Sequence, residues 1–168
     1  MLAKLIVEGR EFPIEIQDPR LKELLMPKKK TGYERVGSNE SFYIEDELGV
    51  CEMLPSTEES VKSEIFENAV YYSSQTVPEN NARADKLMRQ LRRFAVEHRG
   101  KELNWKDADQ RKYFIDYNNS NDEIEAAYSV LHNYFGVIYF DTKKTAELAI
   151  TTFHDELIWY FTEYKDSL

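Results

Sequence analysis

The side chains that could carry chemistry in this sequence are one cysteine, three histidines and a large number of carboxylates. Cys51 lies in an apolar, strand-like run, where a cysteine is usually a small packed side chain and seldom a nucleophile. His98, His132 and His154 fall in three different predicted elements, and no Cys/His spacing matches a zinc site. The six glycines are scattered singly, so the sequence has no phosphate-binding loop and no nucleophile elbow. We therefore expect no catalytic residues, no metal ligands and no cofactor, and a protein that binds rather than catalyses.

Two local groups of polar side chains have simpler interpretations than a site. Asp107 and Asp109 predict the start of a helix, where carboxylates favour the positive end of the helix dipole. The segment 118–122 resembles a calcium loop only superficially, because it lacks the required glycine and the terminal bidentate glutamate. A hairpin turn accounts for it better.

The acidic residues are concentrated in one part of the chain. The net charge is −9, and residues 40–67 contain nine acidic residues with Lys62 as the only basic one. Such a surface either keeps the protein soluble or binds a basic groove on a partner. The residues that we expect to form an acidic partner-binding surface are Glu45, Asp46, Glu47, Glu52, Glu58 and Glu59.

Basic residues dominate the segment that follows. Residues 83–101 contain seven basic residues against Asp85 and Glu97. One interpretation is a solvated helix face that balances the acidic segment, and the other is a site for a nucleotide phosphate, a nucleic-acid backbone or an acidic partner. The candidate anion- or nucleotide-binding residues are Lys86, Arg89, Arg92 and Arg93.

Hydrophobic periodicity predicts the elements that position these groups. We expect an N-terminal hairpin of strands 4–7 and 11–16, and a short helix capped by Asp18 with Pro19 at its first position. The next predicted elements are strands at 33–36, 41–45, 50–54 and 69–72, a loop at 55–63, and an amphipathic helix at 78–99 that Gly100 ends.

The second half of the chain repeats this order. Its predicted elements are strands at 113–117, 123–128 and 136–140, a helix capped by Thr142, and a last amphipathic segment at 156–164. Each half is expected to form a three-stranded antiparallel meander followed by a helix. The sequence thus predicts an α+β fold with an N-terminal hairpin and short helix at 1–32, a first lobe at 33–100 and a second lobe at 101–168.

Several stretches resemble a group of uncharacterised proteins from phages and prophages of Gram-positive gut bacteria. The resembling stretches are residues 3–12, 33–36, 42–44, 90–98 and 156–164. The resemblance implies a phage accessory role, and it identifies no active site.

From these features we expect a non-enzymatic phage inhibitor that binds a component of bacterial antiphage immunity, such as a CRISPR nuclease. The alternatives are a sponge that sequesters a nucleotide second messenger and a nucleic-acid-binding regulator. No apolar run is long enough to cross a bilayer, and the N-terminus lacks a signal-peptide core, so the expected location is the host cytoplasm, away from membranes. Whether the chain forms a homodimer is left open.

Overall fold

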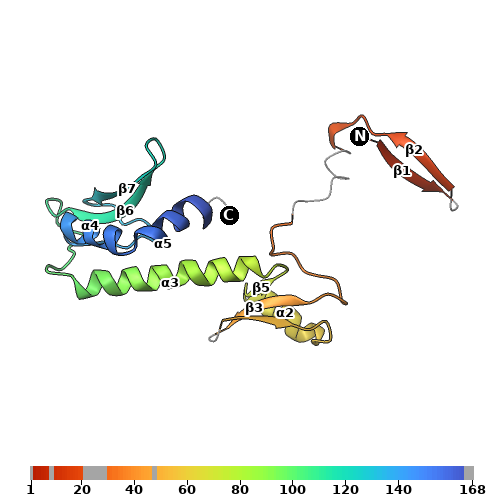
Figure 1. Cartoon of the computed structure of the whole chain (residues 1–168), viewed down its shortest axis with the longest axis horizontal. Coiled ribbons are helices and arrows are strands. Elements are labelled where there is room, and N and C mark those ends of the chain that lie inside the picture. Colours follow the sequence, from red (N-terminus) through yellow and green to blue (C-terminus); the bar gives the residue numbers. More distant parts are fainter. Residues whose placement is uncertain (1, 8–9, 21–29, 47–48, 165–168) are drawn as a thin grey trace.

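The computed structural model describes residues 2–7, 10–20, 30–46 and 49–164. Within these residues the chain forms helices and antiparallel sheets, which confirms the predicted α+β class (Figure 1). The N-terminal hairpin also forms as predicted, since β1 (Leu2–Val7) pairs antiparallel with β2 (Arg10–Glu15). This hairpin stands apart from the other elements in Figure 1.

Asp18 caps the segment after the hairpin. The Arg20 N–H donates to Asp18 Oδ1 at 2.8 Å, and Pro19 takes the helical conformation that the sequence predicts. The remainder of the predicted short helix, with Leu21, Leu24 and Leu25, lies outside the described residues.

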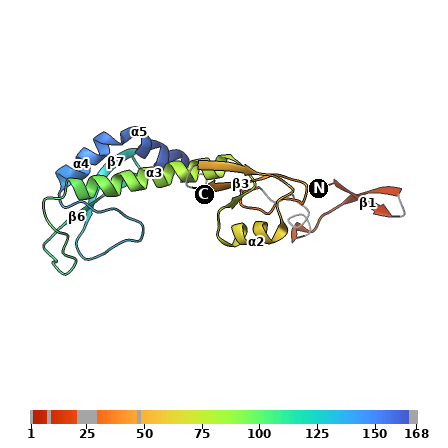
Figure 2. The same ribbon diagram turned by 90° about the horizontal axis from the view of Figure 1, so that it is seen from below.

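The first sheet differs from the predicted meander. It contains β3 (Phe42–Asp46), β4 (Gly49–Met53) and β5 (Tyr71–Tyr72) in the order β4-β3-β5, so the third strand pairs with the first one. Helix α2 (Glu59–Glu67) begins within the segment 55–63 that is predicted to be a loop, and it carries the chain to the far edge of β3. Figure 2 shows α2 below β3, with α3 running away from the sheet toward the second half.

The strand predicted at 33–36 is absent, because side chains there take the place of a backbone ladder. The Glu34 carboxylate accepts hydrogen bonds from the Thr31 hydroxyl at 2.8 Å and from the Gly32 N–H at 3.0 Å. The Val36 N–H donates to the Tyr71 hydroxyl at 3.1 Å. These bonds hold residues 31–36 as a loop over the first sheet.

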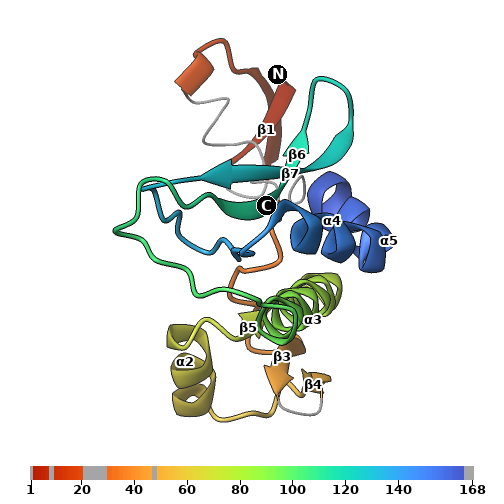
Figure 3. The same cartoon turned by 90° about the vertical axis from the view of Figure 1, so that its left-hand side faces the viewer.

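Helix α3 (Thr76–Glu97) is the long amphipathic helix that the sequence predicts. It ends at Glu97, two residues before the predicted last residue Arg99, and His98 is the C-cap, whose N–H donates to the Phe94 carbonyl at 3.0 Å. Figure 3, viewed nearly along α3, shows the first sheet on one side of the helix and the C-terminal helices on the other.

The second half contains a hairpin and the C-terminal helices. β6 (Lys112–Asn118) pairs antiparallel with β7 (Glu123–Ser129) through the turn predicted at 118–122. The strand predicted at 136–140 is reduced to a single bridge, between Phe140 and Tyr113. The remaining elements are α4 (Lys143–Thr152), α5 (His154–Trp159) and η1 (Tyr160–Tyr164).

The prediction about the start of the C-terminal helices is confirmed. Thr142 caps α4, since its Oγ1 accepts from the Thr145 N–H at 3.1 Å. His154 marks the junction between α4 and α5, as the first residue of α5.

The hydrophobic core is built mainly from α3 and the second half. Its buried residues are Leu87, Leu91, Phe94, Ala95, Phe140, Ala146, Ala149 and Leu157. The core therefore crosses the predicted boundary at residue 100, because the apolar stripe of α3 faces α4 and α5. Both halves share one order of pairing, in which the third segment pairs with the first strand. A duplication of the two halves stays a prediction.

Candidate functional site

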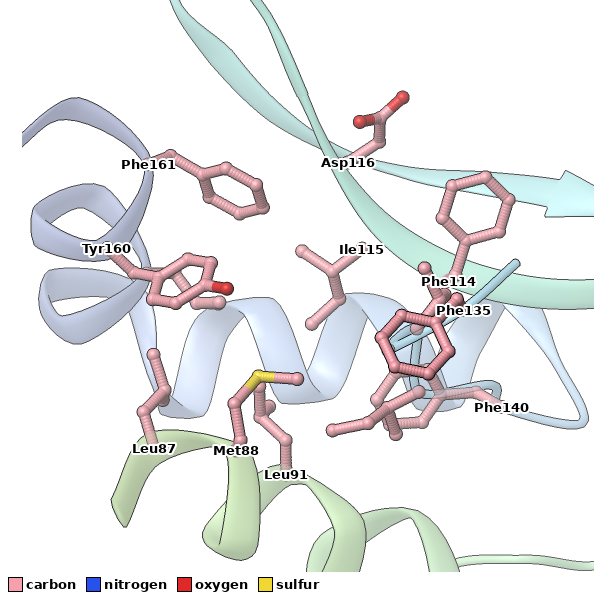
Figure 4. Close-up of a pocket in the computed structure, with 14 residues that line it drawn as sticks. Leu87, Met88, Leu91, Phe114, Ile115, Asp116, Phe135, Phe140, Tyr160 and Phe161 are labelled. Carbon is pink, nitrogen blue, oxygen red and sulfur yellow. The ribbon is translucent and has the colours of Figure 1, made fainter. Parts of the chain in front are cut away.

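An apolar pocket of about 350 Å³ lies between α3, β6, the segment before α4 and the C-terminal helical segment (Figure 4). Among the residues that the structure describes, the lining is almost entirely apolar or aromatic, and Asp116 is its one charged residue. The lining residues are Leu87, Met88, Leu91, Phe114, Ile115, Asp116, Phe135, Gly136, Val137, Ile138, Phe140, Leu157, Tyr160 and Phe161.

The pocket exists because the predicted third strand of this half pairs with β6 only at its last residue, Phe140. Tyr113 and Phe140 exchange two backbone hydrogen bonds, of 2.9 and 2.7 Å. On the N-terminal side of Phe140, residues 135–138 lie away from β6. The pocket lies between these residues and β6. Ile115 points into the pocket toward Met88 and Leu91 in Figure 4.

Polar groups lie at the rim of the pocket. In Figure 4 the Asp116 carboxylate points away from the apolar centre. Asp116 stands directly opposite Glu125 in the β6–β7 ladder, and both side chains are exposed. On the opposite wall, burial raises the pKa of the Tyr160 hydroxyl, with a smaller contribution from Asp85. Tyr160 therefore presents a neutral phenol at physiological pH.

An aromatic turn, defined as residues 131–136, stands beside the pocket. Phe135 at its tip is 105% exposed, and Leu131 and Tyr134 are 56% and 51% exposed. The Tyr139 hydroxyl accepts from the Tyr134 N–H at 2.9 Å and donates to the His132 carbonyl at 3.3 Å. Because Tyr139 itself is buried, these bonds hold the turn in place while its apolar side chains face solvent.

A buried lysine supports the base of the aromatic turn. Lys112 is fully buried, and its ammonium donates to the Asp107 carbonyl at 2.7 Å and the Val130 carbonyl at 2.8 Å. The same ammonium lies 5.4 Å from the ring centroid of Trp105, whose edge meets the buried Tyr139. The lysine thus ties two loops together beneath the turn.

The helix start predicted from Asp107 and Asp109 is wrong. Asp107 Oδ1 accepts from the Asp109 N–H at 2.9 Å and from the Gln110 N–H at 3.2 Å, which makes a turn. The Asp107 carbonyl accepts from the Lys112 ammonium, and the segment leads into β6 at Lys112.

The described residues among those predicted to form one acidic surface are spread over several faces. Glu45 and Asp46 are neighbours in β3 and therefore point to opposite sides of the sheet. Burial raises the pKa of Glu45, with Asp85 adding to this effect and Arg89 opposing it, so Glu45 lies on the side of α3. Asp46 Oδ2 instead accepts the Cys51 thiol at 3.4 Å.

The other predicted acidic residues lie elsewhere. Glu52 is exposed on β4, and Glu58 and Glu59 are exposed at the start of α2, where Glu59 pairs with Arg35 at 3.8 Å. Glu47 lies outside the described residues. Among the five described carboxylates, Glu45 and Glu52 share a face of the sheet, since Glu52 pairs with Tyr43, and the others do not lie on that face together with them.

The predicted basic residues all lie exposed on α3, but their charges are partly neutralised. Arg93 pairs with Glu97 at 2.6 Å, and this hydrogen bond raises the pKa of Arg93. Arg89 lies close enough to Glu45 to influence its titration. Lys86 and Arg92 form no ion pair with a residue of the described segments.

A polar cavity of about 470 Å³ lies beside Lys86, between α3 and the α4–α5 junction. It is also lined by Arg83, His154, Asp155 and Glu156, so acidic side chains balance its basic ones. Arg83 is already bound to Glu156. This balance gives little driving force for binding an anion.

In the described part of the chain, the cysteine and histidine side chains that could carry chemistry do not gather at one site. The hydrogen bond to Asp46 raises the pKa of the Cys51 thiol, with smaller contributions from burial and the charge of Asp46, which disfavours the thiolate. His98 stacks on Phe94 with ring centroids 3.9 Å apart. Among residues 2–7, 10–20, 30–46 and 49–164, no three His, Cys, Asp or Glu side chains gather where they could hold a metal ion.

None of the helices in the described part of the chain combines the length and hydrophobicity that a bilayer crossing requires.

No protein-family model, curated protein or solved structure matches the chain.

Sequence reasoning missed both the pocket and the aromatic turn. A local signal for the turn was present, since Tyr134 and Phe135 precede Gly136 between two predicted strands. Gly136 has φ +75°, which suits glycine and lets the chain reverse directly after Phe135. The pocket has no local signal, because its walls come from four separate segments.

Proposed function

We propose that this protein is a non-catalytic binding protein that attaches to another protein through the apolar pocket and the aromatic turn. Its proposed target is a component of bacterial antiphage immunity, such as a CRISPR nuclease. The observation that carries the mode of binding is Phe135, which a braced turn holds fully exposed beside the pocket.

Exposed aromatic side chains of this kind are typical of binding hot spots. Tyr and Phe are enriched in the buried centres of protein interfaces, where a few residues supply most of the binding energy. The turn is ordered before binding, because Tyr139 and Ser129 hold the His132 carbonyl through their hydroxyl groups. Preordering reduces the entropic cost of association.

The target class rests on the resemblance of the sequence to phage accessory proteins. The proposed contact does not use a single acidic surface, because the five described carboxylates of that prediction are distributed over different faces of the first sheet and α2. The proposed contact surface is the apolar pocket and the aromatic turn.

The nucleotide alternative is weaker than this proposal. The polar cavity beside Lys86 carries two acidic side chains, and Arg83 there is bound to Glu156 at 2.8 Å. Calorimetry with cyclic dinucleotides should therefore show no heat of binding beyond dilution. A strong, salt-sensitive heat would instead support the basic residues of α3 as the functional site.

The test compares capture of partners from phage-infected bacterial lysate by three tagged forms of the protein. We expect Phe135→Ala to reduce capture of its specific partner about tenfold or more, on the order of 2 kcal/mol. Leu148→Ala is the matched control, because Leu148 is a 47% exposed apolar residue on α4 outside the pocket.

A charge-reversal variant separates the two modes of binding. Glu58→Lys with Glu59→Lys should leave capture unchanged if the aromatic turn is the contact surface. Loss of capture in this variant, with Phe135→Ala behaving as the unmodified protein, would overturn the proposal in favour of acidic recognition. A defence assay in cells that carry a CRISPR nuclease tests the target class with the same variants.

A further inference from the structure

We propose that an extended segment of the partner protein adds as a strand to the open edge of β6. Its central side chain is apolar and enters the pocket, and the neighbouring residue opposite Asp116 is basic and lies over Asp116 and Glu125. This inference rests on the proposed function, since it specifies how the partner is held at the same site.

The open edge follows from the single bridge to Phe140. The Tyr113 N–H donates to the Phe140 carbonyl at 2.9 Å, so the peptide groups of Tyr113 point away from β7. Peptide groups alternate in direction along an antiparallel strand, which makes the N–H and C=O of Ile115 point the same way. Neither group has a hydrogen-bond partner among the described residues.

An added strand satisfies both groups of Ile115. Edge strands with unpaired peptide groups are natural templates for another strand, and extended peptides bind many domains in this way. A helical partner cannot do so, because its backbone donors and acceptors are used within the helix. The exposed peptide groups therefore favour an extended occupant over a helical one.

The pocket determines the central side chain of the added strand. A residue opposite Ile115 projects to the same side of the sheet as Ile115. That side faces α3, where Leu87, Met88 and Leu91 line the apolar space in Figure 4. A leucine, isoleucine, valine or methionine matches this lining, whereas a charged side chain would lose its hydration there.

The charge of the rim determines one neighbouring side chain. The residue opposite Asp116 projects to the other side of the sheet from the apolar residue, where Asp116 and Glu125 are direct cross-strand partners, whereas the other neighbour lies opposite Phe114. Like charges placed directly opposite each other are destabilising. Neither carboxylate forms an ion pair with a residue of the described segments. Lysine or arginine on the added strand relieves this repulsion.

The experiment uses the full-length protein and an acetylated, amidated peptide of sequence Lys-Leu-Lys-Val-Lys-Leu-Lys as the probe. Binding is followed by NMR of the ¹⁵N-labelled protein and by calorimetry. We expect the Ile115 amide to shift and its hydrogen exchange to slow. The same peptide with N-methylated amides should bind about tenfold more weakly or worse, since it cannot donate to the edge.

Charge is tested by a variant that preserves local structure. Asp116 Oδ1 accepts from the Tyr117 N–H at 3.0 Å, and Asp116→Asn keeps this oxygen while it removes the charge. We expect a several-fold weaker affinity for the lysine peptide, on the order of threefold to tenfold. Glu67→Gln, at an exposed position on α2, is the matched control and should bind as the unmodified protein does.

Each outcome decides the inference. Equal binding of the N-methylated peptide, or shifts confined to α3 with an unchanged Ile115 amide, would overturn strand addition. No binding of the lysine peptide together with loss of partner capture in Phe135→Ala would remove this inference and leave the proposed function standing. Strong peptide binding together with normal partner capture by Phe135→Ala would overturn the proposed function and leave strand addition to β6 standing.

Discussion

Arg83 of α3 and Glu156 of α5 form a two-pronged ion pair, with Nε–Oε2 and Nη2–Oε1 distances of 2.8 and 3.2 Å. The Arg83 guanidinium also lies 3.9 Å from the ring centroid of Trp159. One arginine therefore holds α5 against α3, and α5 in turn continues into η1, which forms one wall of the apolar pocket.

This pair should contribute modestly to stability. Both side chains are more than 40% exposed, so solvent screens the charges, and we expect Arg83→Ala to cost about 1 kcal/mol of unfolding free energy. A double-mutant cycle with Glu156→Gln, measured by chemical denaturation, should give a coupling of about 0.2–1 kcal/mol. A coupling near zero would mean that the Trp159 contact carries the effect of Arg83.

Phe140 should be one of the most sensitive positions in the core. It is 1% exposed, and it joins the core of α3 and α4 to the bridge with Tyr113. We expect Phe140→Ala to destabilise the protein by about 3–5 kcal/mol, through lost burial and the cavity that remains. The matched control is Phe135→Ala, because the same truncation at a fully exposed position should change stability by less than about 0.5 kcal/mol. Similar costs at both positions would contradict the exposed placement of Phe135.

Lys112→Met should loosen the base of the aromatic turn. The substitution keeps much of the side-chain volume but leaves the Asp107 and Val130 carbonyls without their buried donor. We expect a loss of about 2–4 kcal/mol in unfolding free energy. Hydrogen exchange of the amides at 130–136 should accelerate more than that of α4. Uniform acceleration over both segments would show that Lys112 supports global stability only.

The titration of Glu34 should make the stability of the fold depend on pH in the acidic range. Hydrogen bonds from Thr31 are the main reason that the pKa of Glu34 falls from 4.5 to about 2, and the Ser73 hydroxyl donates to the same carboxylate at 3.0 Å. Because the folded-state pKa is the lower one, the carboxylate stabilises the fold above pH 4.5, and this contribution is lost as the pH falls from 4.5 toward 2.

The measurement is the denaturation midpoint between about pH 5 and pH 2. In Glu34→Gln the midpoint should vary less over this range, since the titrating group is gone. Glu67→Gln, at an exposed position on α2, should follow the unmodified protein. If Glu34→Gln kept the full pH dependence, other carboxylates would have to be its source.

Local sequence features were enough to predict the helices and hairpins that have a regular spacing of apolar residues, a capping residue or a short turn. The apolar stripe of Leu87, Leu91 and Phe94 predicts α3, and Thr142 predicts the start of α4 through its hydroxyl cap. The hairpins of β1–β2 and β6–β7 follow from alternating strands around a short turn. In each case the information lies within a few residues of the element.

Tertiary structure decided which strands pair and what the apolar residues enclose. The segment 136–140 has the composition of a strand, yet only Phe140 pairs with β6, because Tyr139 holds the preceding turn through its hydroxyl. Similarly, the consecutive Glu45 and Asp46 point to opposite faces of the sheet, so a run of acidic residues does not make an acidic surface. The pocket and the exposed Phe135 depend on contacts between segments far apart in the chain, and only the folded structure brings these segments together.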